Sequence, residues 1–258
     1  MEVAVPDPAV SAPSYVFWQC RQPPTAAAAP SRETLMPMPA PDFSWHFTPG
    51  NTFTEESGTS GTLSVVAGGE LWLHTGRVIA CDPFVSLGAG EAEPFTAQVE
   101  PGRYRVDAAV ATLVREGEPE ADTPHLRVAA ARLVIKEAPT VSWELALQPG
   151  QDLAELDDEE FFGYGVDAGT GCFYDAGSDG SFPDCAGDEG PLWDAFDTVP
   201  PSPGPHTVTD PATGHNLIAF TSGWGDGAYP TWIGRDEAGA ITCFVTDFFV
   251  VPIEALVP

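Results

Sequence analysis

Apolar and polar side chains alternate with a period of two along most of the chain between residues 62 and 147. A period of two places successive side chains on opposite faces of an extended strand, so each such stretch predicts a strand with one buried face. The stretches are 63–66, 70–74, 77–81, 95–99, 104–114, 126–135 and 141–147. Gly68-Gly69 and Thr75-Gly76 separate the first three and are typical of tight hairpin turns.

The last part of the chain has the same alternation around a glycine-rich loop. Residues 216–249 are interpreted as strand, glycine loop, strand, tight turn and strand. In the final strand Asp247 shares a face with Val245 and Phe249, so an acidic side chain lies among apolar ones. A buried carboxylate needs a partner, and either Arg235 or a loop amide is expected to supply it.

Only two segments favour a helix. Residues 153–162 carry apolar side chains on one side, and residues 191–198 combine an apolar stripe with a proline suited to the first turn. Many short strands with few helices predict a mainly β protein. The expected fold is an antiparallel β sandwich or partly closed barrel with one or two short helices.

Residues 1–50 differ in composition from the remainder because they are rich in proline and alanine. Proline at this density excludes helix interiors and central strands. The segment also holds two short aromatic runs, which favours an arm packed on the body over a free linker. Residues 51–258 are interpreted as a single β-rich domain, and any division into two lobes is expected near 148–165.

The charge balance narrows the classes of partner. The chain has 38 Asp and Glu against 10 Lys and Arg, a formal net charge of −28. Such a surface repels nucleic acid and anionic membranes, whereas it tolerates a small polar molecule or attracts a basic protein. Residues 1–7 show no secretory signal, and no stretch reaches the about 18 apolar residues of a membrane helix, so a cytoplasmic location is expected.

Two glycine loops carry the residues that are best suited to chemistry. One loop lies in 163–175 and the other in 222–229, and each places aspartate beside several glycines. Glycine allows a ligand to approach the backbone closely, and carboxylates beside aromatic rings can hold a polar ligand or act as acids and bases. We therefore expect the two loops to meet and form a cleft. The candidate catalytic residues are Asp226, Asp167 and Asp175, and the candidate ligand-binding residues are Ser222, Trp224, Tyr229, Trp232, Gly169, Gly171, Gly225 and His215.

Three kinds of function agree with such loops. The first is a binding module for a small polar ligand or a basic protein partner. The second is an enzyme with acid–base chemistry of hydrolase or lyase type, in which Asp226 works with Asp167 or Asp175. The third is a scaffold in which each loop aspartate caps a turn. No cofactor is expected and no metal ligand is assigned, although carboxylates on glycine loops would suit Ca²⁺ or Mg²⁺.

Five separated segments resemble one known family. They are TGRVIACDPF at 75–84, PGRYRVDAAV at 101–110, YGVDAGTGCFYD at 164–175, NLIAFTSGWGDGAYPTWIGRDEAGAI at 216–241 and VTDFFVV at 245–251. In this order, over about residues 62–251, they resemble the domain-of-unknown-function family numbered 4241. The resemblance implies a bacterial, soluble, β-rich protein without an assigned activity. The positions that it singles out are Asp82, Asp167, Gly169, Gly171, Asp175, Ser222, Gly223, Gly225, Asp226, Gly227 and Asp247.

Overall fold

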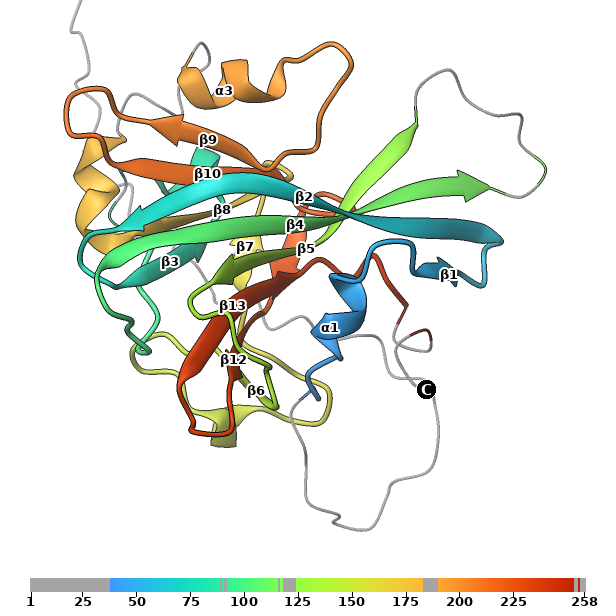
Figure 1. The fold of residues 1–258 in the computed structure, drawn as a ribbon, viewed down its shortest axis with the longest axis horizontal. Helices are drawn as coiled ribbons and strands as arrows, with labels where there is room; N and C mark the ends of the chain where they lie inside the picture. The colour runs from blue at the N-terminus through green and yellow to red at the C-terminus, as the bar shows by residue number, and fades with distance from the viewer. Residues whose placement is uncertain are drawn as a thin grey trace, which may run out of the picture.

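Most of the chain folds into antiparallel sheets with short helices at their edges (Figure 1). The computed structural model describes residues 38–88, 90, 92–115, 117, 124–182, 190–252 and 255. Strand accounts for 43% and helix for 12%, which confirms the mainly β class predicted from the alternation.

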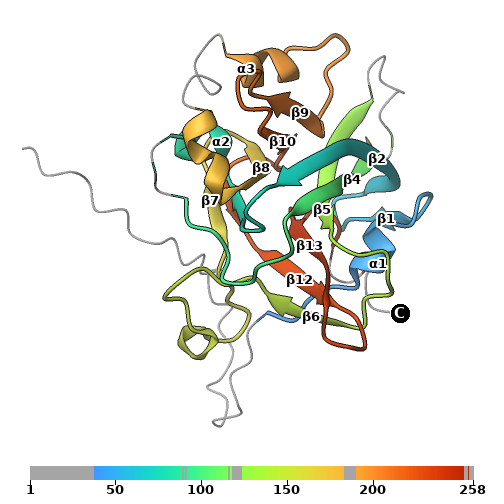
Figure 2. The same ribbon diagram turned by 60° about the vertical axis from the view of Figure 1, so that its left-hand side comes forward.

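The large sheet has seven strands and curls into half a barrel (Figures 1 and 2). In spatial order these are β1 (Thr52–Thr54), β2 (Thr59–Leu73), β4 (Gly102–Arg115), β5 (His125–Val134), β13 (Ile241–Asp247), β12 (Thr231–Arg235) and β6 (Ser142–Leu145). All neighbouring pairs are antiparallel. The partly closed barrel predicted from the sequence is therefore confirmed.

A smaller sheet packs against the large one. Its spatial order is β3 (Val78–Cys81), β8 (Thr170–Asp175), β10 (Asn216–Thr221) and β9 (His206–Thr209). β7 (Tyr164–Val166) and β11 (Gly227–Tyr229) form a separate two-stranded ladder.

Both faces of the small sheet are buried. Phe173, Ile218 and Phe220 join the core of the large sheet, while the alternate residues Tyr174 and Leu217 pack under α3 (Pro191–Phe196) on the opposite face. Because each face covers a different core, β8 is buried at every position instead of alternating. The ends of β8 and β10 are thus held firmly, and both ends carry polar groups.

The short helices begin at acidic or proline residues. They are α1 (Phe43–His46), α2 (Pro83–Ser86) and α3, with the 3-10 turns η1 (Leu153–Glu155) and η2 (Ala176–Ser181). The predicted helix at 191–198 is confirmed as α3. The predicted helix at 153–162 is wrong, because only η1 forms there. The consecutive acidic residues 157–160 repel one another on a helix, and Glu159 has a φ of +62°.

Three predictions about strands and turns need correction. Thr75-Gly76 forms no hairpin turn, because β2 lies in the large sheet and β3 pairs with β8 in the small one. Gly68-Gly69 forms no hairpin turn, because β2 runs through it with a bulge between Ala67 and Gly69. Gly69 absorbs the bulge at a φ of +93°. Residues 95–99 form no strand, since the amide of Phe95 donates to Val78 and the next amide donates to Leu147. Bonds to two different segments cannot build one ladder.

Asp247 lies at the end of β13 and is 5% exposed. Its Oδ1 accepts the amide of Phe249 at 2.9 Å, so a loop amide is the partner, whereas Arg235 pairs with Glu144. Burial raises the pKa of Asp247 to about 7, against the smaller lowering effect of that amide.

Residues 38–50 lie against the large sheet. The amide of Met38 donates to the carbonyl of Glu160 at 3.1 Å, and Phe43 packs edge-on against Trp143 at 4.9 Å. His46 follows in α1 and is fully buried. Residues 1–37 of the proposed arm lie outside the described part of the chain.

Candidate functional site

The two glycine loops lie against each other, as predicted. Gly227 of β11 pairs with Val166 of β7. The amide of Gly169 donates to Asp226 Oδ1 at 3.1 Å, and the amide of Ser222 donates to the Gly169 carbonyl at 3.0 Å. We call the region 166–169 and 222–227 the loop junction. Its geometry is settled, and its role as a binding site stays a prediction.

Asp82 holds one side of the loop junction. It is fully buried, caps α2 through the amide of Phe84 at 2.9 Å, and accepts the amides of Asp167 at 3.0 Å and Ala168 at 2.7 Å. Burial raises the pKa of this carboxyl, and the amide hydrogen bonds oppose that shift. Asp82 therefore positions the backbone of the first loop.

The remaining polar groups of the junction mostly bind its own backbone. The Ser222 hydroxyl donates to the Gly225 carbonyl at 2.8 Å, and the Tyr229 hydroxyl donates to the same oxygen at 2.8 Å. Asp226 accepts the amide of Gly169 and so holds the first loop against the second. Among the candidate residues here, Trp224 is half exposed and has the guanidinium of Arg127 5.6 Å from its ring centroid.

Several other candidate residues lie elsewhere. Trp232 is 4% exposed in β12 and packs near Phe43, 6.4 Å between ring centroids. Gly171 lies inside β8, where a side chain would collide with the hydroxyl of Tyr164. Asp175 and His215 lie together at the opposite end of β8 and β10 from the loop junction, because these strands pair antiparallel.

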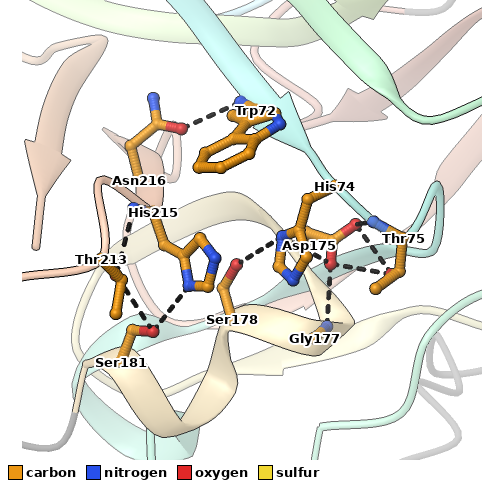
Figure 3. Close-up of polar contacts among 10 residues, drawn as sticks. All are labelled: Trp72, His74, Thr75, Asp175, Gly177, Ser178, Ser181, Thr213, His215 and Asn216. Atoms are coloured by element: carbon orange, nitrogen blue, oxygen red, sulfur yellow. Dashed lines mark hydrogen bonds and ion pairs between the residues drawn. The ribbon is translucent and has the colours of Figure 1, made fainter.

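A cluster of histidine, serine and aspartate side chains forms at that opposite end (Figure 3). We define the histidine cluster as His74, Asp175, Ser178, Ser181 and His215. His74 follows the last residue of β2, Asp175 ends β8 and caps η2, and His215 precedes β10. Three separate segments therefore converge on one place.

Asp175 anchors the cluster. It is fully buried and accepts the amide of Thr75 at 2.9 Å, the hydroxyl of Thr75 at 2.8 Å and the amide of Gly177 at 2.9 Å. Its Oδ1 also lies 3.3 Å from Nδ1 of His74. A carboxylate held by this many donors fixes the orientation of the imidazole beside it.

The two imidazoles are stacked. The rings of His74 and His215 are 4.1 Å apart at their centroids and nearly parallel, at 6°. Trp72 lies tilted against both, with centroids 5.6 Å from His74 and 5.3 Å from His215. Asn216 holds Trp72, since its Oδ1 accepts the Trp72 amide at 2.9 Å and its Nδ2 donates to the Glu70 carbonyl at 2.8 Å.

The Nδ1 atoms of the two rings have different partners. Nδ1 of His74 lies 3.3 Å from Oδ1 of Asp175 and 3.4 Å from the Ser178 hydroxyl, and a hydrogen on Nδ1, toward the carboxyl group, leaves the lone pair of His74 on Nε2. Nδ1 of His215 lies 2.8 Å from the Ser181 hydroxyl. The Thr213 hydroxyl donates to Asp210, and the direction of the Ser181–His215 bond depends on the protonation of the ring. Because Ser181 engages Nδ1, Nε2 is the nitrogen of His215 that is left for a ligand.

Neither Nε2 has a hydrogen-bond partner among the described residues, and neither counts among their buried, unpartnered atoms. Each of the two stacked rings therefore has an Nε2 atom without a partner among the described residues. Two such imidazoles can serve as a general base and, when one is protonated on both nitrogens, as a general acid.

Sequence reasoning named Asp175 and His215 separately and missed His74. Thr75 and Asp175 are 100 residues apart, and no local spacing links them. The only signal was that His74 closes a predicted strand before Thr75-Gly76.

The described residues contain no group of three or more His, Cys, Asp or Glu side chains placed to hold a metal ion. Within the same residues, no helix is long and apolar enough to cross a membrane.

Comparison with known families gives one match. The model of the family described as "Protein of unknown function (DUF4241)" matches residues 71–246, which include β2 from Leu71, both glycine loops and the whole histidine cluster. Neither the curated proteins nor the solved structures yielded a match. The match covers more than half of the chain, and the protein therefore belongs to the DUF4241 family.

Proposed function

We propose that the histidine cluster is the acid–base centre of an enzyme of hydrolase or lyase type, with His74 as general base and His215 as general acid. The observation that carries the proposal is the pair of stacked imidazoles, each with Nδ1 engaged by the protein and Nε2 without a partner among the described residues. Asp175 is a positioning residue in this scheme, because it acts through His74.

Each ring has a defined part in the proton transfers. A water molecule or a substrate X–H group gives its proton to Nε2 of His74 as its electron pair attacks or forms a double bond. His215 takes part in its doubly protonated form, with Nδ1–H toward the Ser181 hydroxyl, so that Nε2–H gives a proton to the leaving atom as the old bond breaks and a neutral ring remains. Exchange with solvent then restores both rings. Positioned acid–base groups of this kind contribute typically about 10²–10⁴ in rate.

The charge of the protein limits the substrate. A formal charge of −28 repels polyanions, so the substrate is a small polar molecule that is neutral or cationic. The proposal keeps the acid–base chemistry expected from the sequence. The proposal assigns the proton transfers to His74 and His215 in place of Asp226 and Asp167, because Asp226 accepts the amide of Gly169 and so holds the backbone of the other loop.

The first test needs no known substrate. Diethyl pyrocarbonate acylates accessible, unprotonated imidazole nitrogens, and mass spectrometry locates the product. We expect rapid modification of His74, slower modification of His215, whose Nδ1 is engaged by Ser181, and none of the fully buried His46. In Asp175→Asn the modification of His74 should slow, because the amide can turn its N–H₂ toward Nδ1 and favour the other tautomer. Equal rates in both proteins would contradict the assigned orientation.

The second test follows turnover. A panel of chromogenic esters and amides identifies a substrate, and kcat is compared between wild type, His74→Gln and His215→Gln. Each variant should lose about 10²–10⁴ in kcat while melting within a few degrees of wild type. His125→Gln is the matched control, because His125 is exposed and outside the cluster. Retained turnover in both cluster variants would reject the proposal.

A second candidate function is binding of a small polar ligand or basic protein at the loop junction. It is favoured by Trp224, which is 50% exposed on a loop that Asp226 holds in place, with exposed carboxylates of Asp167 and Asp226 nearby in sequence. An oligolysine peptide titrated against tryptophan fluorescence tests it. Trp224→Ala and Asp167→Asn should each weaken the binding, and unchanged binding would exclude this surface.

A further inference from the structure

A small hollow on the large sheet gathers positive charge in a strongly acidic protein. Its volume is about 70 Å³, and Arg105, Arg132 and Lys136 line it together with Glu137, Thr140, Thr242 and Cys243. These are three of the ten Lys and Arg residues of the chain, and Lys136 is its only lysine. We refer to this place as the cationic hollow.

The carboxylates around the hollow use only part of its donors. Asp107 is shared, since Arg105 Nε donates to it at 3.0 Å and Arg132 Nη2 donates to it at 3.0 Å. Glu137 pairs with Arg105 and Asp236 pairs with Lys136. Each arginine has five N–H groups and lysine has three, so several donors stay free.

One of the free donors is buried. Nε of Arg132 is inaccessible to solvent and has no partner among the described residues. The guanidinium itself lies over the ring of Phe47, 3.9 Å from the ring centroid, and is therefore fixed in place. The Arg132 side chain is 26% exposed, so an ion in the hollow meets other atoms of this side chain and not the enclosed Nε.

Further polar groups complete the lining. The hydroxyls of Thr140 and Thr242 are 2.6 Å apart, and Sγ of Cys243 lies 3.7 Å from the Thr242 hydroxyl. An ordered water needs roughly 10–15 Å³ of such space, so the hollow has room for the four oxygens of an oxyanion.

We propose that the cationic hollow is a binding site for an oxyanion of phosphate or sulfate size, either free or as the head group of a larger molecule. Arginine forks match the oxygens of such an ion, and the lysine adds a point charge. The proposal does not depend on acid–base chemistry at the histidine cluster.

Glu137 is the group with which an incoming anion competes. Its side chain is 73% exposed and it holds Arg105, whereas Asp107 is 6% exposed and stays in place. Removing the charge of Glu137 should therefore strengthen anion binding. Removing the charge of Lys136 should weaken it. The net charge of −28 opposes every anion, so the affinity should be modest and should depend on ionic strength.

The experiment titrates inorganic phosphate into the full-length protein by calorimetry, with sodium chloride adjusted to keep the ionic strength constant. We expect saturable binding that Glu137→Gln tightens by about two- to fivefold and Lys136→Gln weakens by about two- to fivefold, because exposed ion pairs are weak. Both side chains are largely exposed, and circular dichroism checks that the variants remain folded. A parallel titration with glycerol phosphate decides whether the site takes a free ion or a head group.

Cys243 provides a second measurement at the same place. Cys243 is 5% exposed, so its alkylation by neutral iodoacetamide should be slow, and phosphate should slow it further while the alkylation of Cys81 and Cys172, measured in the same mass spectrum, stays unchanged. No saturation, equal effects of chloride and phosphate, or an affinity unchanged by Glu137→Gln would each overturn the proposal.

Discussion

The two ends of the small sheet use the same device for different purposes. Asp82 at the loop junction and Asp175 at the histidine cluster are both fully buried and both cap a short helical turn through the amide two residues ahead. Each also binds a distant segment, Asp167 and Ala168 in one case and Thr75 in the other. Only Asp175 has an imidazole beside it.

The comparison teaches that burial alone does not mark a chemical group. At the loop junction the oxygens of Asp82 bind backbone amides, so the carboxylate orders the chain but orients no second titratable side chain. At the other end Asp175 lies 3.3 Å from Nδ1 of His74, so its charge acts on a ring whose Nε2 has no partner among the described residues. What matters is whether a buried acid binds backbone or a second titratable side chain.

The largest expected effect on stability tests the first half of this comparison. Asp82→Ala leaves three buried or partly buried amides without an acceptor, and we expect a loss of about 3–5 kcal/mol in the free energy of unfolding. Asp42→Ala is the matched control, since Asp42 caps α1 in the same way but is exposed, and it should cost about 1 kcal/mol. Urea unfolding of both variants measures the two losses in the free energy of unfolding. Equal losses would mean that Asp82 is an ordinary cap.

A third buried carboxylate sharpens the comparison, because Asp247 has a single amide partner. Its pKa is raised to about 7, above its value in the unfolded chain, so the folded protein holds the proton more tightly. Stability from this group is therefore present at low pH and falls as pH rises from about 4 to about 7. Asp247→Asn should match wild type near pH 4 and exceed it at pH 8 by up to ~4 kcal/mol.

Thermal unfolding of both proteins from pH 4 to 8 measures this difference. His46 changes stability in the opposite sense, since burial lowers its pKa to about 4, partly offset by Asp42, and acidification below about 6.5 destabilises the fold. Both proteins contain His46, so the difference between them isolates Asp247. A difference independent of pH would show that the carboxyl is not buried.

The smallest effect concerns Asp226. Asp226→Ala removes one exposed hydrogen bond to the Gly169 amide and should cost about 1 kcal/mol, whereas Asp226→Asn keeps an acceptor and should cost less. Melting temperatures of the two variants provide the measurement. Loss of turnover at the histidine cluster in either variant would show that the two ends are coupled.

Alternation along the chain was sufficient to predict the sheets, but it could not predict how strands are interrupted. The glycines at 68–69 look like a turn in sequence, yet both flanks of β2 pair with β4, and the extra residue becomes a bulge. Residues 153–162 have helical apolar spacing, and the acidic run within them opposes it. Local patterns give the type of an element, while its continuity depends on its partners.

The candidate site was predictable only in parts. Glycine-rich loops that follow strands gave the loop junction, because flexible backbone and aspartates are visible locally. His74 follows β2 and Asp175 ends β8, and their meeting depends on the register of β3 against β8. Trp232 was expected in the cleft because it follows Tyr229 closely, but the alternation of β12 directs it toward Phe43.

Asn216 has a consequence that extends beyond its own bonds. Its Oδ1 accepts the backbone amide of Trp72 and its Nδ2 donates to the Glu70 carbonyl. One side chain thus makes two hydrogen bonds to β2 that a neighbouring strand would otherwise make. These two hydrogen bonds link the small sheet to β2, and a single substitution at Asn216 removes them. An aspartate in its place offers two acceptors to a carbonyl that needs a donor. A substitution at Asn216 should thus change the distance between the His74 and His215 rings, although Asn216 contacts no nitrogen of either ring.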